Sequence, residues 1–311
     1  MRAVVVREFG GPEALEVVEQ PVPEPGPGQV RVAVQAASVN PVDLAVRAGG
    51  TVAIGFALPR EQYGVGWDLA GRVDAVGPGA GFAVGDQVIG TVDRLDLTLG
   101  SYAEYVVLDS GCVGRAPRDA TPAEASTIPL NALTADQALD LLDLPPGSTV
   151  LVTGAAGGVG GFAVELAVLR GLRVAAQAGR DDEKLVRELG ASHFIPRDVP
   201  NVADAAREWA PGGVDGVVDT AELKAAALEA LRGGGALVSV GYGSDPVPRR
   251  GTRVHSVWIR ADGPRLTELS ALADAGLISL RVAATYPLED APAAHARLAA
   301  GGVRGRLVLV P

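Results

Sequence analysis

The sequence predicts an α/β protein in two parts, a β-rich first part and a doubly wound parallel sheet. The length of 311 residues favours two cores over one. The first ~115 residues contain β-branched, partly alternating runs that are separated by Pro and Gly clusters. From about residue 148 to 241, strand-like and helix-like segments alternate regularly, which is the pattern of a parallel sheet covered by helices.

In the first part, four runs predict strands within a compact β-domain that has irregular loops and little helical periodicity: RAVVVREF, QVRVAVQAASV, AGRVDAV and YAEYVVLD. A helix is expected over residues 121–142, because Thr121, Pro122 and Glu124 form a helix start signal and apolar residues follow at helical spacing.

In the second part, strands and helices are expected in turn. The strands are STVLVTG, RVAAQAG, VDGVVDT and ALVSVG, and the helices between them are GVGGFAVELAVLRG, DDEKLVRELG and AELKAAALEALRGGG. The tail predicts a strand RVHSVWIR, a helix PRLTELSALADAG, a strand LRVAATY, a helix LEDAPAAHARLAAG and a closing strand RGRLVLV.

Composition limits the classes of function. A net charge of -10 repels phosphate backbones, so nucleic-acid binding is not expected as the main role. The single cysteine, Cys112, excludes an intrachain disulfide and suits a reducing cytoplasm. No signal-peptide pattern and no apolar run of ~18 residues is present, so no membrane association is expected. The preference for arginine over lysine is typical of GC-rich bacterial genomes.

The strongest local signal is VLVTGAAGGVG, residues 150–160, where a buried strand meets a glycine-rich turn and a helix opens at once. Glycine permits a tight turn and close approach of a pyrophosphate, and the helix N-terminus offers N–H groups and a positive dipole end. The motif therefore predicts a Rossmann-type dinucleotide site. Its contacts are expected at Gly154, Ala156, Gly157, Gly158, Val159 and Gly160.

The residues after the next strand favour NADPH over NADH. An NAD site places Asp or Glu there to hold the ribose 2′-hydroxyl, whereas this chain has Gly179 followed by Arg180. A guanidinium suits a 2′-phosphate, and Lys184 adds charge one helical turn further on. Asp181 and Asp182 argue for NAD, although both also suit the first turn of a helix, and a solvated helix face also accounts for both cations, so the alternatives stay open.

Taken together, the segments resemble the medium-chain dehydrogenase/reductase superfamily and its zinc-independent quinone oxidoreductase (zeta-crystallin-like) branch. The resemblance lies in SVNPVDLAVRAG, GWDLAGRVDAVGPGAGFAVGDQVIG, GSYAEYVVL, ALTADQALD, VTGAAGGVG, LRGGGALVSVG and TYPLEDAPAAHARLAAGGVRGRLVL. It implies a GroES-like β-barrel catalytic domain, residues 1–120 plus 265–311, and a Rossmann NADP-binding domain, residues 121–264, with the active site in the cleft. It also implies hydride transfer to an activated acceptor, and a homodimer.

The resemblance also implies that no metal is used. Zinc-dependent relatives carry a catalytic Cys where this chain has Asn40, and a His–Glu pair where it has Trp67 and Asp68. Without a Lewis acid, alcohol oxidation is disfavoured, whereas a quinone or enone already has a site for hydride.

The same resemblance names candidate site residues. Asn40 and Asp43 lie in a loop that faces the nicotinamide in the family, Asp43 as a brace, and Thr134 also lies near it. A tyrosine usual in relatives is Ala45 here, and Tyr63 is a substitute proton donor. Turn chemistry and an ordinary helix residue are the simpler interpretations of Asn40, Asp43 and Thr134. Further cofactor contacts are expected at Arg197, Gly241, Val257 and Ile259, and the loop from Ala48 to Tyr63 is expected to select the acceptor.

Three functions remain open. The first is an NADPH-dependent reductase of a quinone or an α,β-unsaturated carbonyl. The second is an enoyl-thioester reductase of the polyketide or fatty-acid type, against which Ala45 weighs slightly. The third is an NADPH-binding protein with little turnover and a structural or regulatory role. All three need an intact phosphate loop, and only the acceptor distinguishes them.

Overall fold

The computed structural model describes residues 1–94, 97–241 and 245–311, which form two compact units. Unit 1 contains Met1–Leu130, Arg260–Ala275 and Leu280–Pro311, and unit 2 contains Asn131–Ile259 and Gly276–Ser279. The first division lies within helix α4 (Pro129–Leu142), later than the expected bound at residue 120, because helix α3 (Pro122–Ala125) packs against strands of unit 1.

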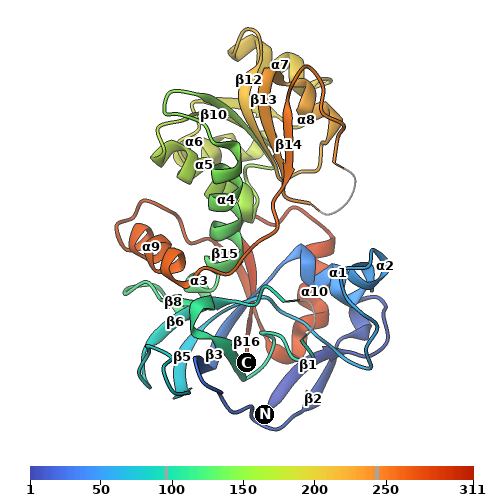
Figure 1. Cartoon of the computed structure of the whole chain (residues 1–311). Helices are drawn as coiled ribbons and strands as arrows, with labels where there is room; N and C mark the ends of the chain where they lie inside the picture. Colours follow the sequence, from blue (N-terminus) through green and yellow to red (C-terminus); the bar gives the residue numbers. More distant parts are fainter. Residues whose placement is uncertain (95–96, 242–244) are drawn as a thin grey trace. The chain divides into compact units, whose positions relative to one another are not determined.

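Unit 1 contains two sheets, and Figure 1 labels most of their strands. The small sheet has the order β2-β1-β4, with β1 Arg2–Val6, β2 Glu16–Glu19 and β4 Tyr63–Gly64. The large sheet has the order β15-β16-β3-β5-β6-β8, and β7 also pairs with β3. Its strands are β3 Gln29–Val39, β5 Asp68–Val76, β6 Gln87–Thr91, β7 Tyr105–Asp109, β8 Val113–Arg115, β15 Val282–Pro287 and β16 Arg306–Val310.

Strand β3 organises unit 1, because it pairs with three other strands. Its first residues alternate between buried and half-buried positions, as the alternating sequence predicts. Its last residues pair antiparallel with β16, where Leu309 lies opposite Ala37 and both side chains are buried. The N-terminal strand β1 and the C-terminal strand β16 therefore contribute side chains to the same hydrophobic core.

The helices of unit 1 include two that the sequence did not predict, α1 (Pro41–Arg47) and α2 (Gly50–Ala53). The segment SVNPVD, expected as a loop, contains the start of α1. Pro41 has the backbone angle that a first helical residue needs, and the Asp43 carboxylate accepts a 2.7 Å hydrogen bond from the Asn40 N–H. The other helices are η1 Pro12–Ala14, η2 Ser110–Cys112, α9 Gly263–Asp274, η4 Leu288–Asp290 and α10 Ala291–Ala299.

Unit 2 is a six-stranded sheet in the order β11-β10-β9-β12-β13-β14, and every strand pair is parallel (Figure 1). This is the doubly wound order, whose direction reverses between β9 and β12. The strands are β9 Thr149–Thr153, β10 Arg173–Ala178, β11 His193–Pro196, β12 Val214–Asp219, β13 Leu231–Ser239 and β14 Arg253–Ser256. One face of the sheet buries Leu151, Ile195, Val217 and Leu237.

The helices of unit 2 correct three sequence predictions. The helix expected over residues 221–235 is reduced to α8 (Ala225–Glu229), and the glycines expected to stop it belong to β13. Strand β11 and helix α7 (Val202–Trp209) were not predicted. The remaining helices are α5 Gly158–Leu169, η3 Arg180–Asp182 and α6 Glu183–Glu188. In the part of the chain that the structure describes, no helix is long and apolar enough to cross a bilayer.

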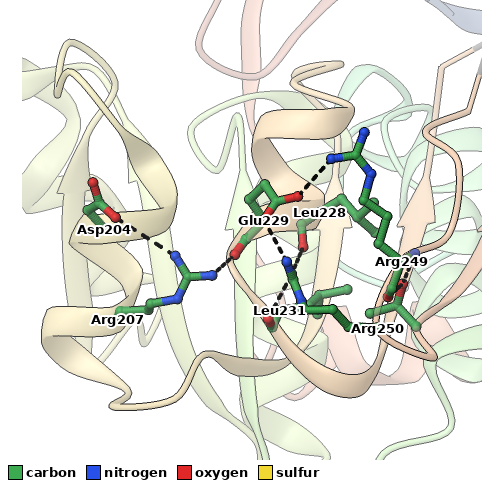
Figure 2. A network of polar contacts seen from close by, with 8 residues as sticks. Asp204, Arg207, Leu228, Glu229, Leu231, Arg249 and Arg250 are labelled. Atoms are coloured by element: carbon green, nitrogen blue, oxygen red, sulfur yellow. Dashed lines mark hydrogen bonds and ion pairs between the residues drawn. The ribbon is translucent and has the colours of Figure 1, made fainter.

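Figure 2 shows why α8 ends where it does. Arg250 donates to the Glu229 carboxylate at 2.7 Å and to the Leu228 and Leu231 carbonyls at 3.5 and 3.4 Å. Arg207 donates to the Glu229 carbonyl. Guanidinium groups at a helix C-terminus satisfy its last carbonyls and oppose the negative end of its dipole. The network therefore stabilises the C-terminal end of α8 and its junction with β13.

Candidate active site

The glycine-rich loop between β9 and α5 has no room for a side chain at two of its glycines, Gly154 and Gly160. Gly154 has a positive φ of 61°, and a Cβ there would lie 2.7 Å from the Thr220 hydroxyl. A Cβ on Gly160 would lie 2.2 Å from the Gly154 carbonyl oxygen, so the helix packs directly on the turn. The N-cap is Gly157, which has no side chain to cover the first-turn N–H groups. The loop fits a pyrophosphate.

The six loop residues predicted to bind phosphate lie together at this turn and in the first turn of α5. They are Gly154, Ala156, Gly157, Gly158, Val159 and Gly160. Because β9 adjoins β12 at the point where the strand order reverses, the loop lies at the edge where doubly wound sheets bind nucleotides.

The predicted 2′-phosphate residues Gly179, Arg180 and Lys184 follow β10, and Arg197, predicted as a further cofactor contact, follows β11. A Cβ on Gly179 would lie 2.9 Å from the Asp182 carboxylate and 3.9 Å from the Arg197 guanidinium carbon, so an acidic and a basic side chain both flank the end of β10. Arg180 donates a 2.9 Å hydrogen bond to Asp198, and this hydrogen bond lowers the pKa of the Asp198 carboxyl. Lys184 instead forms an exposed pair with Glu188 on α6 at 3.7 Å. The structure thus places Asp182 and Arg197 beside Gly179, whereas Lys184 pairs with Glu188.

Asp219, at the end of β12, is a site residue that the sequence reasoning missed. Its buried carboxylate accepts from the Thr153 hydroxyl at 2.6 Å and from the N–H groups of Leu223 and Lys224 at 3.1 and 2.7 Å. These contacts join the carboxyl ends of β9 and β12. One feature of the sequence could have identified Asp219. It ends the largely apolar run VDGVVD, and a charged residue at the end of a buried strand is uncommon unless it has partners.

Glu222 was also missed. It has a positive φ of 55°, and a Cβ on Gly241 would lie 2.4 Å from its carboxylate. Glu222 therefore lies against Gly241, which the sequence predicts to border the nicotinamide. Val257 and Ile259 lie beyond β14 and not within it as expected, although the Val257 N–H still donates to the Ser239 carbonyl at 2.9 Å.

In unit 1, Asn40 and Asp43 belong to a buried polar cluster that comprises Asn40, Asp43, Arg47, Asp68, Tyr102, His295 and Arg306. Asp43 accepts from the Asn40 N–H, from the Gly66 N–H at 3.1 Å and from the Tyr102 hydroxyl at 3.0 Å. The Asn40 amide donates to the Asp68 carboxylate at 3.1 Å. Asp43 thus braces three segments of backbone and side chain from a fully buried position.

The contacts of His295 determine the direction of its hydrogen bonds. Arg47 has only donors, so His295 Nδ1 accepts from it at 3.4 Å. His295 Nε2 then donates to the Tyr102 oxygen at 3.2 Å, and the Tyr102 hydroxyl proton goes to Asp43. Burial, aided by the Arg47 charge, lowers the pKa of His295 to about 3, so the ring is neutral.

Two carboxyls and one guanidinium share the other side of the cluster. Burial raises the pKa of Asp43 to about 7, against its three hydrogen bonds, and raises the pKa of Asp68 well above its usual range. Burial also lowers the pKa of Arg306 to about 10, although Asp68 opposes this shift. Among the described residues, Asp68 Oδ2 and Arg306 Nε have no hydrogen-bond partner.

These shifts predict a pH dependence of stability. The folded protein holds the Asp43 proton more tightly than the unfolded chain does, so Asp43 stabilises the fold below pH ~4 and this contribution is lost as the pH rises through about 7. We expect Asp43→Asn to remove a slope worth at most about 4 kcal/mol over this range. Urea unfolding of both proteins at pH 4 to 8 tests this; parallel pH profiles would contradict it.

Tyr63 lies at a pocket within unit 1. The pocket is narrow, with room for little more than a water-sized group, and its surface is partly polar; its lining includes Val46, Thr51, Tyr63, Trp67, Val92 and Arg94. The Tyr63 oxygen accepts from the Arg60 N–H at 2.8 Å, and its proton reaches the Leu58 carbonyl only at 3.5 Å. Thr134, the remaining candidate, lies on α4 in unit 2 with 6% of its surface exposed.

Comparisons with known proteins define the family. The "Alcohol dehydrogenase GroES-like domain" family matches residues 26–118, and the "Zinc-binding dehydrogenase" family matches residues 189–309. The quinone oxidoreductase of Homo sapiens is 30% identical over 100% of this chain and 98% of its own length. The chain therefore belongs to the medium-chain dehydrogenase/reductase superfamily, in its quinone oxidoreductase-like branch.

Other relatives widen the range of chemistry. Spectinabilin polyketide synthase system protein NorB of Streptomyces orinoci is 35% identical over 98% of this chain, which spans only 14% of that protein. Among solved structures, an NAD-dependent alcohol dehydrogenase has a TM-score of 0.88 at 34% identity, and mycobacterial Rv1454c complexed with NADPH has 0.84 at 31%, each covering 100% of both chains. This chain is an oxidoreductase that uses a nicotinamide cofactor.

Proposed function

We propose that the chain is a zinc-independent, NADPH-dependent reductase of quinones or α,β-unsaturated carbonyls. The observation that carries this proposal is the glycine turn at α5, combined with Arg180 and Arg197 at the ends of β10 and β11. The last residue of β10 is Ala178, so the strand end itself has no carboxylate, and the Asp182 carboxylate beside Gly179 is the group that would favour a ribose 2′-hydroxyl instead. The NADPH of the mycobacterial structure supports the same choice.

In this proposal the backbone of residues 154–160 binds the pyrophosphate, and Arg180 and Arg197 bind the 2′-phosphate in competition with Asp198. Gly241, Thr134, Val257 and Ile259 border the nicotinamide. When bound, the reduced nicotinamide supplies two electrons and one proton as hydride. The second proton comes from water or from Tyr63, so that a quinone becomes a quinol and an enone becomes a saturated ketone.

The residues of unit 1 prepare the acceptor. The hydrogen bond from the Tyr63 hydroxyl to the Leu58 carbonyl is long, at 3.5 Å, so this hydroxyl can donate to another group. We therefore assign Tyr63 as the hydrogen-bond donor to the oxygen of the acceptor. Asn40 and Asp43 are fully buried and already hydrogen-bonded, and we assign both a positioning role. Asp43 holds the Gly66 N–H, and Gly66 lines the same pocket as Tyr63.

The test is loss of absorbance at 340 nm with NADPH and then NADH, across benzoquinone, naphthoquinone, 2-alkenals and crotonyl thioesters. Turnover of a quinone or enone, faster with NADPH than with NADH, is the expected result. Binding of NADPH without reduction of any acceptor would favour the third function, a nucleotide-binding protein with little turnover.

Arg180 should decide the choice of nucleotide. Removal of one charge-assisted phosphate contact costs about 1.5–3 kcal/mol, so we expect Arg180→Ala to raise the Kd for NADPH by at least tenfold and to leave the Kd for NADH within twofold. Fluorescence titration measures both. Arg187→Ala is the matched control, because Arg187 lies on the next helix and pairs with Glu183. Equal losses for both nucleotides would contradict a 2′-phosphate role.

The second candidate is an enoyl-thioester reductase, which the similarity to NorB over 98% of this chain favours. Reduction of crotonyl thioesters at a higher kcat/KM than quinones or 2-alkenals would establish it.

A homodimer is part of both proposals. Strand β14 is an edge strand of the sheet in unit 2, and sedimentation at several protein concentrations tests the assembly.

A further inference from the structure

The segment that follows α2 exposes several large apolar side chains to solvent. Residues 50–59 carry no charge, and Ile54, Phe56 and Leu58 are 53%, 43% and 73% exposed. Phe9, which follows β1, is 43% exposed. We call these four residues the apolar strip. Clustered exposed apolar residues mark a binding surface more often than scattered ones do.

The strip is attached to the pocket that contains Tyr63. The N–H groups of Phe56 and Ala57 both donate to the carbonyl of Thr51, a pocket residue, at 2.8 and 3.1 Å. The Tyr63 oxygen is held by Arg60 and reaches the Leu58 carbonyl. The Phe9 and Tyr63 rings lie 4.9 Å apart.

The strip is also a built feature and not a loose loop. Gly49 has a positive φ of 76°, and a Cβ there would lie 2.6 Å from the Phe9 ring, so glycine at this position makes room for Phe9. The Gly10 N–H donates to the Arg47 carbonyl at 3.2 Å, which ties the Phe9 segment to α1. An apolar surface that is held in place by these contacts is pre-organised for an apolar ligand.

We propose that the apolar strip binds the aliphatic tail of the acceptor, so that the preferred substrates are quinones or enones with an extended alkyl or prenyl chain. The reacting carbonyl occupies the pocket beside Tyr63, and the chain leaves it across Phe56 and Leu58. This inference rests on the proposed function, because it assigns the acceptor to the same pocket. A tail without charge also avoids the repulsion that a net charge of -10 exerts on anionic acceptors.

The test compares chain lengths in two ways. Kinetics use 3-alken-2-ones from five to eleven carbons with saturating NADPH, and calorimetry measures binding of the saturated 2-alkanones of the same lengths. Full burial of a methylene is worth about a fourfold change in affinity, so partial burial on the strip should lower KM and Kd about twofold per carbon. We expect kcat to change little.

Phe56→Ser and Leu58→Ser should flatten this dependence, so that KM and Kd no longer fall as the chain grows. Val84→Ser is the matched control, because Val84 is 63% exposed in another turn of unit 1 and should keep the full dependence. Retained dependence in both strip variants would overturn the inference. A second result would also overturn it: the two strip variants keep the chain-length dependence but lose the binding to phosphatidylcholine vesicles that the parent protein shows. The strip would then be a lipid contact.

The proposed function and this inference fail differently. If no enone or quinone is reduced, the proposed function fails, and the alkanone calorimetry still decides whether the strip binds alkyl chains. If the five-carbon enone is reduced and neither KM nor Kd depends on length, the reductase stands and the strip is not a tail site.

Discussion

Replacing Gly160 with alanine is expected to weaken NADPH and NADH binding by at least tenfold and to lower the thermal stability of the protein. The added Cβ would lie 2.2 Å from the Gly154 oxygen and 2.9 Å from the Ala155 Cα, and both are backbone atoms that cannot rotate away. Helix α5 must therefore move off β9. The movement displaces the N–H groups that face the phosphates, which the third glycine of the motif keeps close.

Alanine substitutions at two other glycines should have smaller effects than Gly160→Ala. A Cβ on Gly157 would lie 3.1 Å from the Gly154 oxygen, so Gly157→Ala should have a smaller effect. Gly233→Ala, on β13, meets only the Arg250 carbonyl at 3.6 Å and should leave nucleotide binding unchanged. Nucleotide titration by fluorescence and thermal unfolding measure the series. If Gly160→Ala bound NADPH within twofold of the parent protein, the turn would not be the phosphate site.

Replacing Arg306 with methionine is expected to destabilise the protein progressively as the pH rises above about 7, by up to about 3–5 kcal/mol where Asp43 is ionised. Arg306 is a buried cation whose charge opposes the raised pKa values of Asp43 and Asp68, and methionine leaves these carboxyls without it. An unpaired buried charge costs this much because it stays desolvated, so the loss follows the fraction of the carboxyls that is ionised. Urea unfolding, followed by circular dichroism and fluorescence, measures the change.

The controls separate charge from packing. Arg72→Met removes an exposed arginine from β5 of the same unit and should change stability by less than about 0.5 kcal/mol. Asp68→Asn in the Arg306→Met background should recover part of the loss, and lowering the pH to 5 should also reduce it, because protonated carboxyls need no counter-charge. A loss below about 1 kcal/mol for Arg306→Met would mean that the cluster does not depend on its cation.

Much of unit 2 could be predicted from the sequence because its signals are local. The strand, the glycines and the helix of residues 150–169 are adjacent in the chain, and each residue type has a steric reason there. Helix α1 was missed because its seven residues are too few to show a period, and Asn40–Pro41 also starts turns. Helix α8 was overextended because Leu231 continues the apolar pattern but pairs with Val214 of β12, and the glycines after it lie in β13.

The sequence by itself determined the doubly wound sheet, the nucleotide turn and the family, since these depend on residues a few positions apart. Only the tertiary structure decided what Asn40 and Asp43 do. Tyr102 lies 59 residues from Asp43 along the chain, and His295 lies 248 residues from Arg47. No local pattern reports such contacts, because burial and hydrogen bonding across a core arise only when distant strands and helices pack together.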